Sequence, residues 1–481
     1  MNLHQRIIKN IVSMVSSQAL FAASLFVFNV LIARYLGDAE FGKYSFAIAF
    51  TSLFGIFSSL GLEAVVTRDV VLDKSVAGKY FGNALVLQVI GSIFMFFLVM
   101  LTINLSQNAQ DARTVVYIVA LGTIATSFVY LCRAIFRAFE KMEWDIVPTV
   151  AGTCFLLGVG FFVLYSGYDL VQVVWVYSAA QLLIFAVGLA IVITKFTRPR
   201  IKLAESLWKY LLVTTVPFAL NGLLVQVYFR IDTVILAFLK GDIVVGWYTA
   251  AYTLAVIPLS VIITGFGRAL FPSVAHAFVF TKELYRTLVE RAVRYSLVLL
   301  IPMATGVTLL AGKIIPFIFG SQFSNSIGSL QLLIWAGILL FLNILYVGIL
   351  EATRKQKRAT LLLAIGAGMN TVLSFVLIPQ FSLTGAAISA LVTQLICVLI
   401  SCYMVGQNIE IKALANSFIK PIIASAVMGL FIFYFGYLHI ILLIFIGIVI
   451  YCLSFYLLRG ITEEDLKTFK SLIDINREKQ E

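Results

Sequence analysis

The sequence predicts an all-α polytopic membrane protein with about fourteen transmembrane helices. Of its 481 residues, 61% are hydrophobic and only 12% are charged, and the mean hydropathy is +1.02. Soluble globular chains carry about a quarter charged residues, so this composition excludes that class. The apolar residues gather in stretches long enough to cross a bilayer, and the short segments between them alternate between basic and nearly uncharged.

Each stretch has about the 20 residues that a helix needs to cross a hydrocarbon core about 30 Å thick. Pro217, Pro258 and Pro302 fall inside such stretches, where we expect them to kink the helix. In chain order, the predicted spans lie near residues 11–34, 42–62, 81–104, 114–135, 145–166, 171–194, 212–238, 243–266, 293–312, 328–350, 359–378, 384–405, 417–436 and 439–458.

The lysine and arginine residues predict the orientation. Counted from a cytoplasmic N-terminus, the inside segments hold 29 of the 35 Lys and Arg residues, and the outside segments hold five. The last one, Arg230, lies inside a span. Such an excess of basic residues marks the cytoplasmic side of a membrane protein. We therefore expect a multi-pass protein of the cytoplasmic (plasma) membrane with both termini in the cytoplasm.

The same loops account for the formal net charge of +12, so we expect no nucleic-acid partner. The five cysteines form no CxxC pair, and the three histidines are scattered along the chain. Neither a metal site nor a cofactor is predicted.

An internal repeat relates residues 31–47 to residues 235–251 at a constant offset of 204. Both copies carry the pattern Gly-Asp-x-x-x-Gly-x-Tyr and both fall at the predicted outer turn after the first helix of a set. The identical pairs are Ala33/Ala237, Gly37/Gly241, Asp38/Asp242, Gly42/Gly246, Tyr44/Tyr248 and Ala47/Ala251.

The offset contains six spans, and an even number keeps the two copies parallel. We expect an N-terminal six-helix lobe over residues 1–206 and a C-terminal six-helix lobe over 207–406, around a central cavity. Helices 13 and 14 with a cytoplasmic tail occupy 407–481 and have no counterpart in the repeat. We expect these two helices to border a lateral groove for a lipid tail, with plain bilayer anchoring or a dimer contact as the alternatives.

The motifs resemble those of a transporter family. Ala33 to Gly37 and Glu40 to Tyr44 are similar to the opening of polysaccharide-transporter flippases, the Wzx-like branch of the multidrug/oligosaccharidyl-lipid/polysaccharide exporter superfamily. Phe229 to Leu236 and Gly246 to Tyr252 resemble the seventh and eighth helices of that family, and Ile315 to Gly320 resembles the loop after the ninth.

The resemblance implies a flippase and not an enzyme. It implies that a polyprenyl-(di)phosphate-linked oligosaccharide, undecaprenyl-linked in bacteria or dolichol-linked in archaea, moves from the inner to the outer leaflet by alternating access. The product would feed surface polysaccharide or glycan assembly. The expected partners are this lipid-linked oligosaccharide and the bilayer. A coupling proton or sodium ion and other polysaccharide-assembly proteins stay open.

Arg230 is the main candidate for binding the phosphate of such a substrate. Charge inside a span is costly, so a charge retained there needs a partner or a function. Gly222, Gln226, Arg230 and Thr233 share one helical face, which makes a polar stripe suited to a cavity wall. A guanidinium can bind phosphate through two parallel hydrogen bonds. The alternative is that Arg230 pairs with an acid and only locks helices together.

Asp232 is the carboxylate inside the same span. Two residues make about 200° around a helix, so Asp232 should point away from Arg230. It either carries a coupling proton or cation, or accepts hydrogen bonds that lock helices. Further substrate-binding candidates are Arg34, Asn29 and Asn221, each with an interfacial or helix-packing role as the alternative.

Three other functions compete with the flippase interpretation. A cation-coupled multidrug antiporter of the same superfamily is disfavoured. The resemblance implies about twelve spans and a carboxylate in the first helix for many such antiporters, whereas residues 11–33 contain no acid here and two extra spans are predicted. A flippase of the peptidoglycan lipid precursor shares the fourteen-span plan and stays an alternative. A sugar polymerase or ligase would need a sizeable outward loop with a catalytic constellation, and the predicted outer loops are short.

Overall fold

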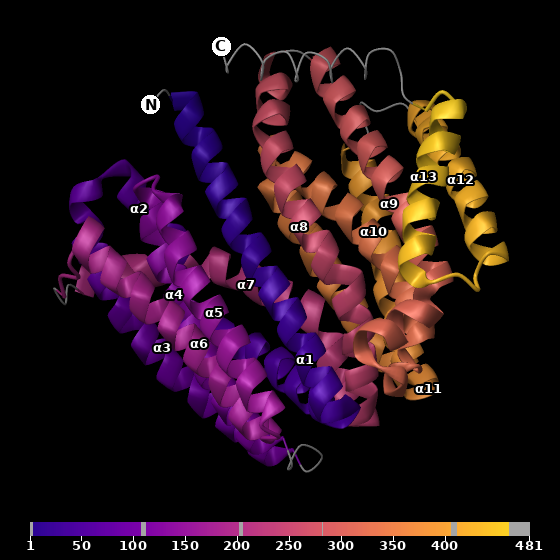
Figure 1. Ribbon diagram of the computed structural model, residues 1–481. Helices are drawn as coiled ribbons and strands as arrows, with labels where there is room; N and C mark the ends of the chain where they lie inside the picture. Colours follow the sequence, from indigo (N-terminus) through magenta and orange to yellow (C-terminus); the bar gives the residue numbers. More distant parts are fainter. Residues whose placement is uncertain (1–2, 107–111, 202–204, 281, 406–410, 461–481) are drawn as a thin grey trace, which may run out of the picture.

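The computed structural model describes residues 3–106, 112–201, 205–280, 282–405 and 411–460, and within these ranges every regular element is helical (Figure 1). In chain order the elements are α1 (Leu3–Ser59), α2 (Leu62–Leu72), η1 (Lys74–Val76), α3 (Ala77–Leu105), α4 (Arg113–Ala138), η2 (Met142–Asp145), α5 (Ile146–Tyr165), α6 (Leu170–Ile191), η3 (Val192–Phe196), α7 (Glu205–Lys240), α8 (Asp242–Phe280), α9 (Lys282–Phe319), η4 (Ser321–Phe323), α10 (Ser326–Ala352), α11 (Gln356–Val405), α12 (Ile411–Tyr434) and α13 (Ile440–Leu457).

Eleven helical segments in the described part of the chain are long and apolar enough to cross a bilayer, which confirms the predicted class of an all-α polytopic membrane protein. Two of these segments are kinked. In α1 the backbone leaves the helical region at Gly37, where φ is 87°, and in α11 it does so at Ser382, where φ is 55°. Both kinks fall where the sequence predicts an outer turn between two spans. The total of fourteen spans stays a prediction.

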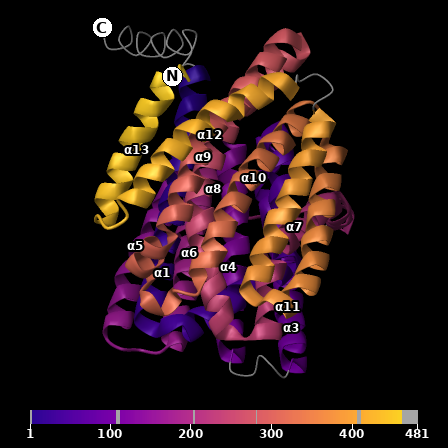
Figure 2. The ribbon, with the colours of Figure 1, turned by 90° about the vertical axis from the view of Figure 1, so that its right-hand side faces the viewer.

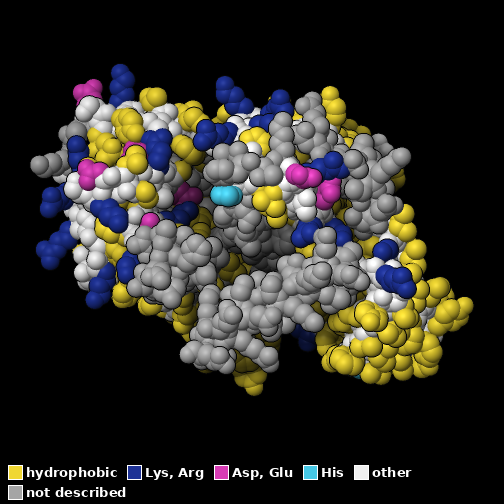
Figure 3. All heavy atoms as spheres, turned by 90° about the horizontal axis from the view of Figure 1, so that it is seen from above, with side chains coloured by type: hydrophobic (Ala, Val, Ile, Leu, Met, Phe, Trp, Pro, Cys, Tyr) yellow, Lys and Arg dark blue, Asp and Glu magenta, His cyan; other side chains and the backbone are white. Residues whose placement is uncertain are grey.

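The helices form two bundles, an N-terminal bundle of α1 to α6 and a C-terminal bundle of α7 to α13. In the first, α6 packs against α4 and α5; in the second, α10 packs against α8 and α11, and α7 against α11. The bundles approach each other at the end away from the N-terminus and spread apart toward the end where the N-terminus lies (Figure 1). Seen from the latter end, the surface is hollowed between them (Figure 3). The predicted lobe boundaries near residues 206 and 406 stay a prediction.

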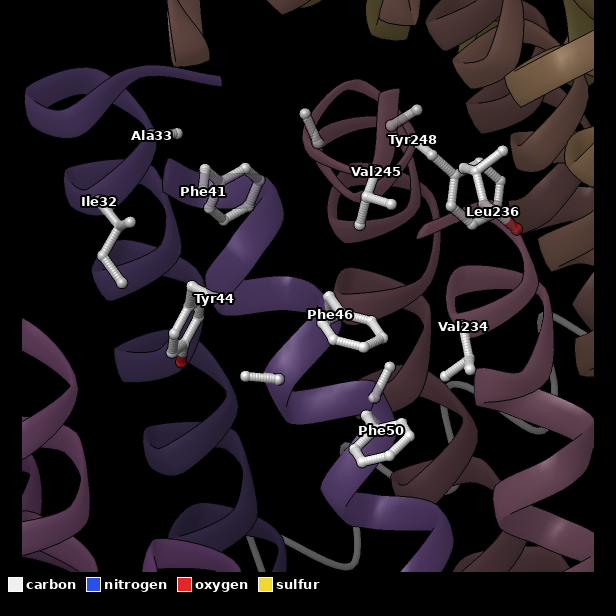
Figure 4. Close-up of a cluster of buried hydrophobic side chains, with 14 of the residues drawn as sticks. Ile32, Ala33, Phe41, Tyr44, Phe46, Phe50, Val234, Leu236, Val245 and Tyr248 are labelled. Carbon is white, nitrogen blue, oxygen red and sulfur yellow. The ribbon is translucent and has the colours of Figure 1, made fainter. Parts of the chain in front are cut away.

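The largest apolar cluster lies where the bundles meet. It includes Phe41 and Phe46 of α1, Tyr248 of α8, and Phe319 and Phe323 at the end of α9 and in η4. Figure 4 shows Phe46 and Phe50 pointing from α1 toward the helices that carry Val234 and Val245. Lipid tails are as apolar as these side chains, so the contact is stabilised by close packing more than by burial from water. Because it is closely packed, this contact between the bundles is sensitive to small changes of side-chain volume.

Helices α12 and α13 lie at the edge of the C-terminal bundle, where they pack against α9 (Figure 2). Met428 of α12 and Leu443 of α13 are buried with Leu310 of α9, whereas Phe433 and Phe445 are largely exposed. Both helices are strongly apolar, and exposed aromatic side chains on such helices are ordinary where the surface faces lipid. The tail expected after helix 14 lies, from residue 461 on, outside the described residues.

Candidate functional site

Arg230 lies on α7, between the two bundles. Its side chain is half-buried and interacts electrostatically with the phenol groups of Tyr44, Tyr177 and Tyr252. Tyr44 belongs to α1 and Tyr177 to α6 of the N-terminal bundle, whereas Tyr252 belongs to α8 of the C-terminal bundle. Phenol groups from both bundles therefore lie within electrostatic range of one guanidinium. Guanidinium and phenol groups all donate hydrogen bonds, and donors of this kind suit the oxygens of a phosphate.

Aromatic contacts hold these tyrosines in place. The rings of Tyr44 and Tyr177 meet edge to face with their centroids 6.1 Å apart, so α1 and α6 are joined beside Arg230. On the other side, Tyr252 packs against Tyr248 one turn earlier on α8, with centroids 6.2 Å apart. Aromatic pairs at such separations contribute about 0.5–1.5 kcal/mol beyond the burial of their area. The hydroxyl groups are thus presented by rings that are already fixed before any ligand arrives.

Asp232, two residues further along α7, lies inside the C-terminal bundle with only 3% of its surface exposed. Its Oδ2 accepts a hydrogen bond of 2.5 Å from the Tyr248 hydroxyl on α8, and its Oδ1 accepts one of 2.7 Å from the backbone N–H of Thr233. The carboxylate therefore ties α7 to α8. A buried acidic group without such donors would be strongly destabilising.

The two repeats differ at this point. At the offset of 204, Asp232 corresponds to Phe28 and Tyr248 to Tyr44. In the N-terminal bundle, Phe28 and Tyr44 meet edge to face with centroids 6.2 Å apart. The C-terminal bundle has a carboxylate and a phenol in the same place, joined by a hydrogen bond. The scaffold therefore accepts an aromatic pair here, and the carboxylate in the C-terminal bundle is an addition to it.

A small cavity of about 30 Å³ adjoins Asp232 between α7, α8, α10 and α11. Asn370 and Thr393 line it, and within the described residues Asn370 Oδ1 and Thr393 Oγ1 have no hydrogen-bond partner. The other polar groups nearby hold helices together: Asn370 Nδ2 donates to the Tyr228 carbonyl at 3.2 Å, and the Tyr228 hydroxyl donates to Gln394 at 2.8 Å. The cavity has room for one water molecule or one small ion.

Arg34 is exposed, and its guanidinium is held by the protein itself. Its Nε donates a hydrogen bond of 2.7 Å to the carbonyl of Ile318, and its Nη2 donates to the carbonyl of Phe317. These carbonyls belong to the last turn of α9, where they lack partners within the helix, so Arg34 caps that helix end. Together with Gln322 it lines a surface pocket of about 510 Å³.

The amides that the sequence singled out lie in different places. Gln226 and Asn29 are half-buried and Asn221 is exposed. A methyl group added to Gly222, one turn before Gln226, would lie 3.2 Å from the Ile56 side chain of α1, so this face of α7 looks toward the N-terminal bundle. The structure thus brings Gln226 and Arg230 onto the face of α7 that lies between the bundles, whereas Arg34 is bound to α9.

Two arginines near the C-terminal end of α4, in the N-terminal bundle, are paired with acids. Arg133 Nε lies 2.7 Å from Asp145 Oδ1, and Arg137 Nη2 lies 3.1 Å from Glu63 Oε2. Asp145 also accepts a hydrogen bond of 2.9 Å from Ser17 on α1. These side chains border a cavity of about 110 Å³. Their charges are largely compensated there, so they are weaker phosphate candidates than Arg230.

Sequence reasoning missed the three tyrosines around Arg230. Two signals pointed to them: Tyr44 is one of the identical positions of the repeat, and Tyr252 closes the motif that begins at Gly246. Tyr177 gave no signal, because its partner Tyr44 is 133 positions away and an aromatic residue in a span is ordinary.

Two known flippases align with most of this chain. The chain is 23% identical over 479 residues to the probable low-salt glycan biosynthesis flippase Agl15 of Haloferax volcanii, covering 96% of this chain and 99% of that protein. It is 24% identical to the lipid II flippase MurJ of Bacillus subtilis, covering 86% and 88% of the two chains. Both of these relatives are named as flippases and not as enzymes.

Similarity to solved structures supports the same fold. A lipid II flippase MurJ in an inward closed conformation superimposes with a TM-score of 0.78 at 16% identity, covering 93% of this chain and 98% of that one. The model of the polysaccharide biosynthesis protein family matches residues 7–278, more than half of the chain, including Arg230, Asp232 and both copies of the repeated motif. The chain belongs to the polysaccharide biosynthesis protein family.

Proposed function

We propose that this protein is a flippase that moves a polyprenyl-(di)phosphate-linked oligosaccharide from the inner to the outer leaflet of the cytoplasmic membrane by alternating access. Its product would serve surface polysaccharide or glycan assembly. The observation that carries the proposal is Arg230, a half-buried cation between two membrane bundles that interacts electrostatically with phenol groups of both. The family and the glycan flippase from Haloferax volcanii support the substrate class.

In this mechanism the phosphate of the substrate binds Arg230 and the sugar chain occupies the hollow between the bundles. Gln226 lies on the same face of α7, one turn nearer the N-terminal end of that helix, and offers an amide to sugar hydroxyls. Tyr44, Tyr177 and Tyr252 supply further donors. Because these donors come from both bundles, they separate when the bundles rock apart, and the phosphate is then released on the other side.

The orientation is part of the proposal. Both termini lie in the cytoplasm, because the inside segments then carry 29 of the 35 basic residues. The hollow between the bundles opens at the end where the N-terminus lies, so the proposed topology makes this an inward-open arrangement (Figure 3). In this conformation the hollow is open to substrate that enters from the inner leaflet.

For Asp232 we propose a helix-locking role, since both of its oxygens accept hydrogen bonds from within the C-terminal bundle. A coupling proton or sodium ion is the alternative, supported by the adjoining cavity, where the oxygens of Asn370 and Thr393 have no hydrogen-bond partner among the described residues. Substitution Asp232→Asn separates the two. If Asp232 only locks helices, the amide oxygen of asparagine can accept the same hydrogen bonds and much of the transport is retained. If Asp232 binds a proton or a cation, the substitution abolishes transport.

The peptidoglycan lipid-precursor flippase stays the second candidate, because a relative of that activity aligns over 86% of this chain. The test uses purified protein in liposomes, given either a polyprenyl-diphosphate-linked oligosaccharide or lipid II, with exposure in the outer leaflet read by an enzyme that cannot cross the membrane. We expect transport of the oligosaccharide. Transport of lipid II alone would favour the second candidate.

Arg230 is tested in the same assay. Arg230→Ala should abolish transport without loss of folded protein, and Arg230→Lys should restore part of it, because the charge survives but the two-pronged hydrogen bonding does not. Lys240→Ala, at the exposed end of the same helix, is the matched control and should transport normally. Normal transport by Arg230→Ala, or a loss explained entirely by misfolding, would contradict the proposed role.

A further inference from the structure

The repeated Gly-Asp-x-x-x-Gly motif forms a contact between its own two copies. The contact joins Asp38 and Gly42 of α1 to Asp242 and Gly246 of α8, and we call these four residues the glycine seam. A methyl group added to Gly42 would lie 1.8 Å from the carbonyl oxygen of Asp242, and one added to Gly246 would lie 2.1 Å from the carbonyl oxygen of Asp38. Each glycine therefore meets the aspartate of the other copy, backbone to backbone.

The contact is reciprocal in the same way as the interface of a symmetric dimer, where one patch meets its own copy. Glycine is required at both positions because a Cβ atom would overlap a backbone atom that cannot turn aside. Small residues serve the same purpose where membrane helices approach most closely. In the turns that precede the seam, Gly37 and Gly241 also match, with φ values of 87° and 84°. Both copies thus share one backbone path into the contact.

Further contacts between the bundles surround the seam. The Trp247 indole Nε1 donates a hydrogen bond of 2.9 Å to Asp38 Oδ2. Phe46 of α1 meets Phe238 of α7 edge to face, with centroids 5.5 Å apart. The Gln322 amide, beyond α9, donates to the carbonyl of Ala33 at 3.1 Å. All of these contacts lie at the end where the bundles meet, opposite the hollow that opens toward the N-terminus (Figure 1).

We propose that the glycine seam is the outer gate of the protein: it holds the two bundles together on the outside while the substrate loads from the inside, and it separates completely when the protein opens outward. The proposal rests on the proposed function for the direction of opening. It adds the residues that close the gate and the property they exploit, which is the absence of a side chain at two matched positions.

A seam of this kind behaves as a two-state contact. With hydrogen in place of a side chain, the backbones touch and the neighbouring aromatic side chains pack. A single methyl group on either glycine leaves no room for the closed contact, so the closed state loses stability while the open state is untouched. The population then shifts toward the outward-open state. The substrate can then no longer load from the inside, because loading requires the state in which the outer contact is closed. Every substrate-binding side chain is nevertheless intact.

The test measures the distance between the bundles on the outer side by electron paramagnetic resonance. Spin labels are attached to cysteines introduced at Tyr168 and Phe381, which are 50% and 52% exposed, in a background without the five native cysteines. We expect Gly42→Ala and Gly246→Ala each to raise the ratio of the long to the short distance on the order of tenfold or more, as overpacking of a close contact does. Gly312→Ala is the matched control, because a methyl group there meets no other helix of the described part of the chain within 4 Å.

Trp247→Phe gives a second, gentler perturbation, since it removes the hydrogen bond to Asp38 and adds no atoms at the seam. It should shift the same ratio in the same direction by less than the glycine variants. The proposal is overturned if folded Gly42→Ala or Gly246→Ala keeps the distances of the unmodified protein. It is equally overturned if neither variant folds and Trp247→Phe keeps those distances.

The distance measurement needs no substrate, so it separates this proposal from the proposed function. A shift toward the long distance in a protein that transports no lipid-linked oligosaccharide would keep the gate and refute the function. Unchanged distances in a protein that transports the oligosaccharide would refute the gate and keep the function.

Discussion

The hydrogen bond between Tyr248 and Asp232 can be removed by deleting one oxygen atom, the hydroxyl oxygen of Tyr248. Tyr248→Phe deletes the hydroxyl that donates to Asp232 Oδ2 at 2.5 Å and keeps the ring, which is fully buried. Asp232 Oδ1 retains two donors, the backbone N–H of Thr233 at 2.7 Å and the Thr233 hydroxyl at 3.4 Å. The substitution therefore leaves one carboxylate oxygen without a donor in a site that is 3% exposed.

The expected cost follows from this geometry. Side-chain hydrogen bonds between membrane helices average about 0.6 kcal/mol, with a maximum of about 1.7 kcal/mol. A charged acceptor raises the value to about 1.5–3 kcal/mol, and an acceptor left buried and unpaired costs a similar amount. We expect Tyr248→Phe to lower the free energy of unfolding by about 1.5–3 kcal/mol. Tyr44→Phe, at the matching position of the other repeat, contacts the apolar Phe28 and should cost less.

The assay is reversible unfolding of purified protein in mixed micelles, followed by the fluorescence of the native tryptophans. A double-mutant cycle with Asp232→Asn isolates the coupling between the two side chains, because the loss from Tyr248→Phe should shrink when the carboxylate is already an amide. Equal losses in Tyr248→Phe and Tyr44→Phe, or a loss that is independent of Asp232→Asn, would refute the argument that this pair locks α7 to α8.

Three further outcomes are expected. A cysteine introduced at Lys74 should react only with reagents that enter the cytoplasm, and one at Tyr168 only with reagents outside; the reverse pattern would invert the topology. Truncation after Asn408, which removes α12 and α13, should leave folded protein that no longer transports the long lipid-linked substrate; normal transport would exclude a role of this pair in holding the lipid tail. Arg34→Gln should cost about 0.3–1 kcal/mol of stability, the usual worth of a cation at a helix C-terminus, with transport unchanged if capping α9 is its whole role; a raised KM would instead show that Arg34 binds substrate.

The class of fold could be predicted from the sequence because it depends on one-dimensional properties. Span length and hydropathy are properties of contiguous residues, and the bilayer accepts only structures that satisfy every backbone group internally. The two outer turns expected after the first and the eleventh span appear as kinks at Gly37 and Ser382. Only the glycine could have been foreseen there, because a serine at positive φ has no signature in sequence.

The site could be predicted only in part, because its members come from distant parts of the chain. Arg230 was recognisable as a lone cation in a span, but the partners of Arg34 lie 283 and 284 positions away, at the end of α9. The residue types at both ends of that contact are unremarkable, and backbone carbonyls leave no trace in a sequence. The repeat, in contrast, was visible as a pattern, while the contact between its two copies was not.

The opposite charges of Arg230 and Asp232 stand two residues apart on one helix. With the carboxylate ionised, the charges of Arg230 and Asp232 cancel. A membrane potential therefore does little work on this pair as the bundles of the substrate-free protein rock. A bound phosphate makes the moving unit negative, and a proton on Asp232 makes it positive. Each elementary charge that crosses the full field is worth about 2.3 kcal/mol per 100 mV. The voltage dependence of turnover would therefore report which of these groups is occupied during the rate-limiting movement.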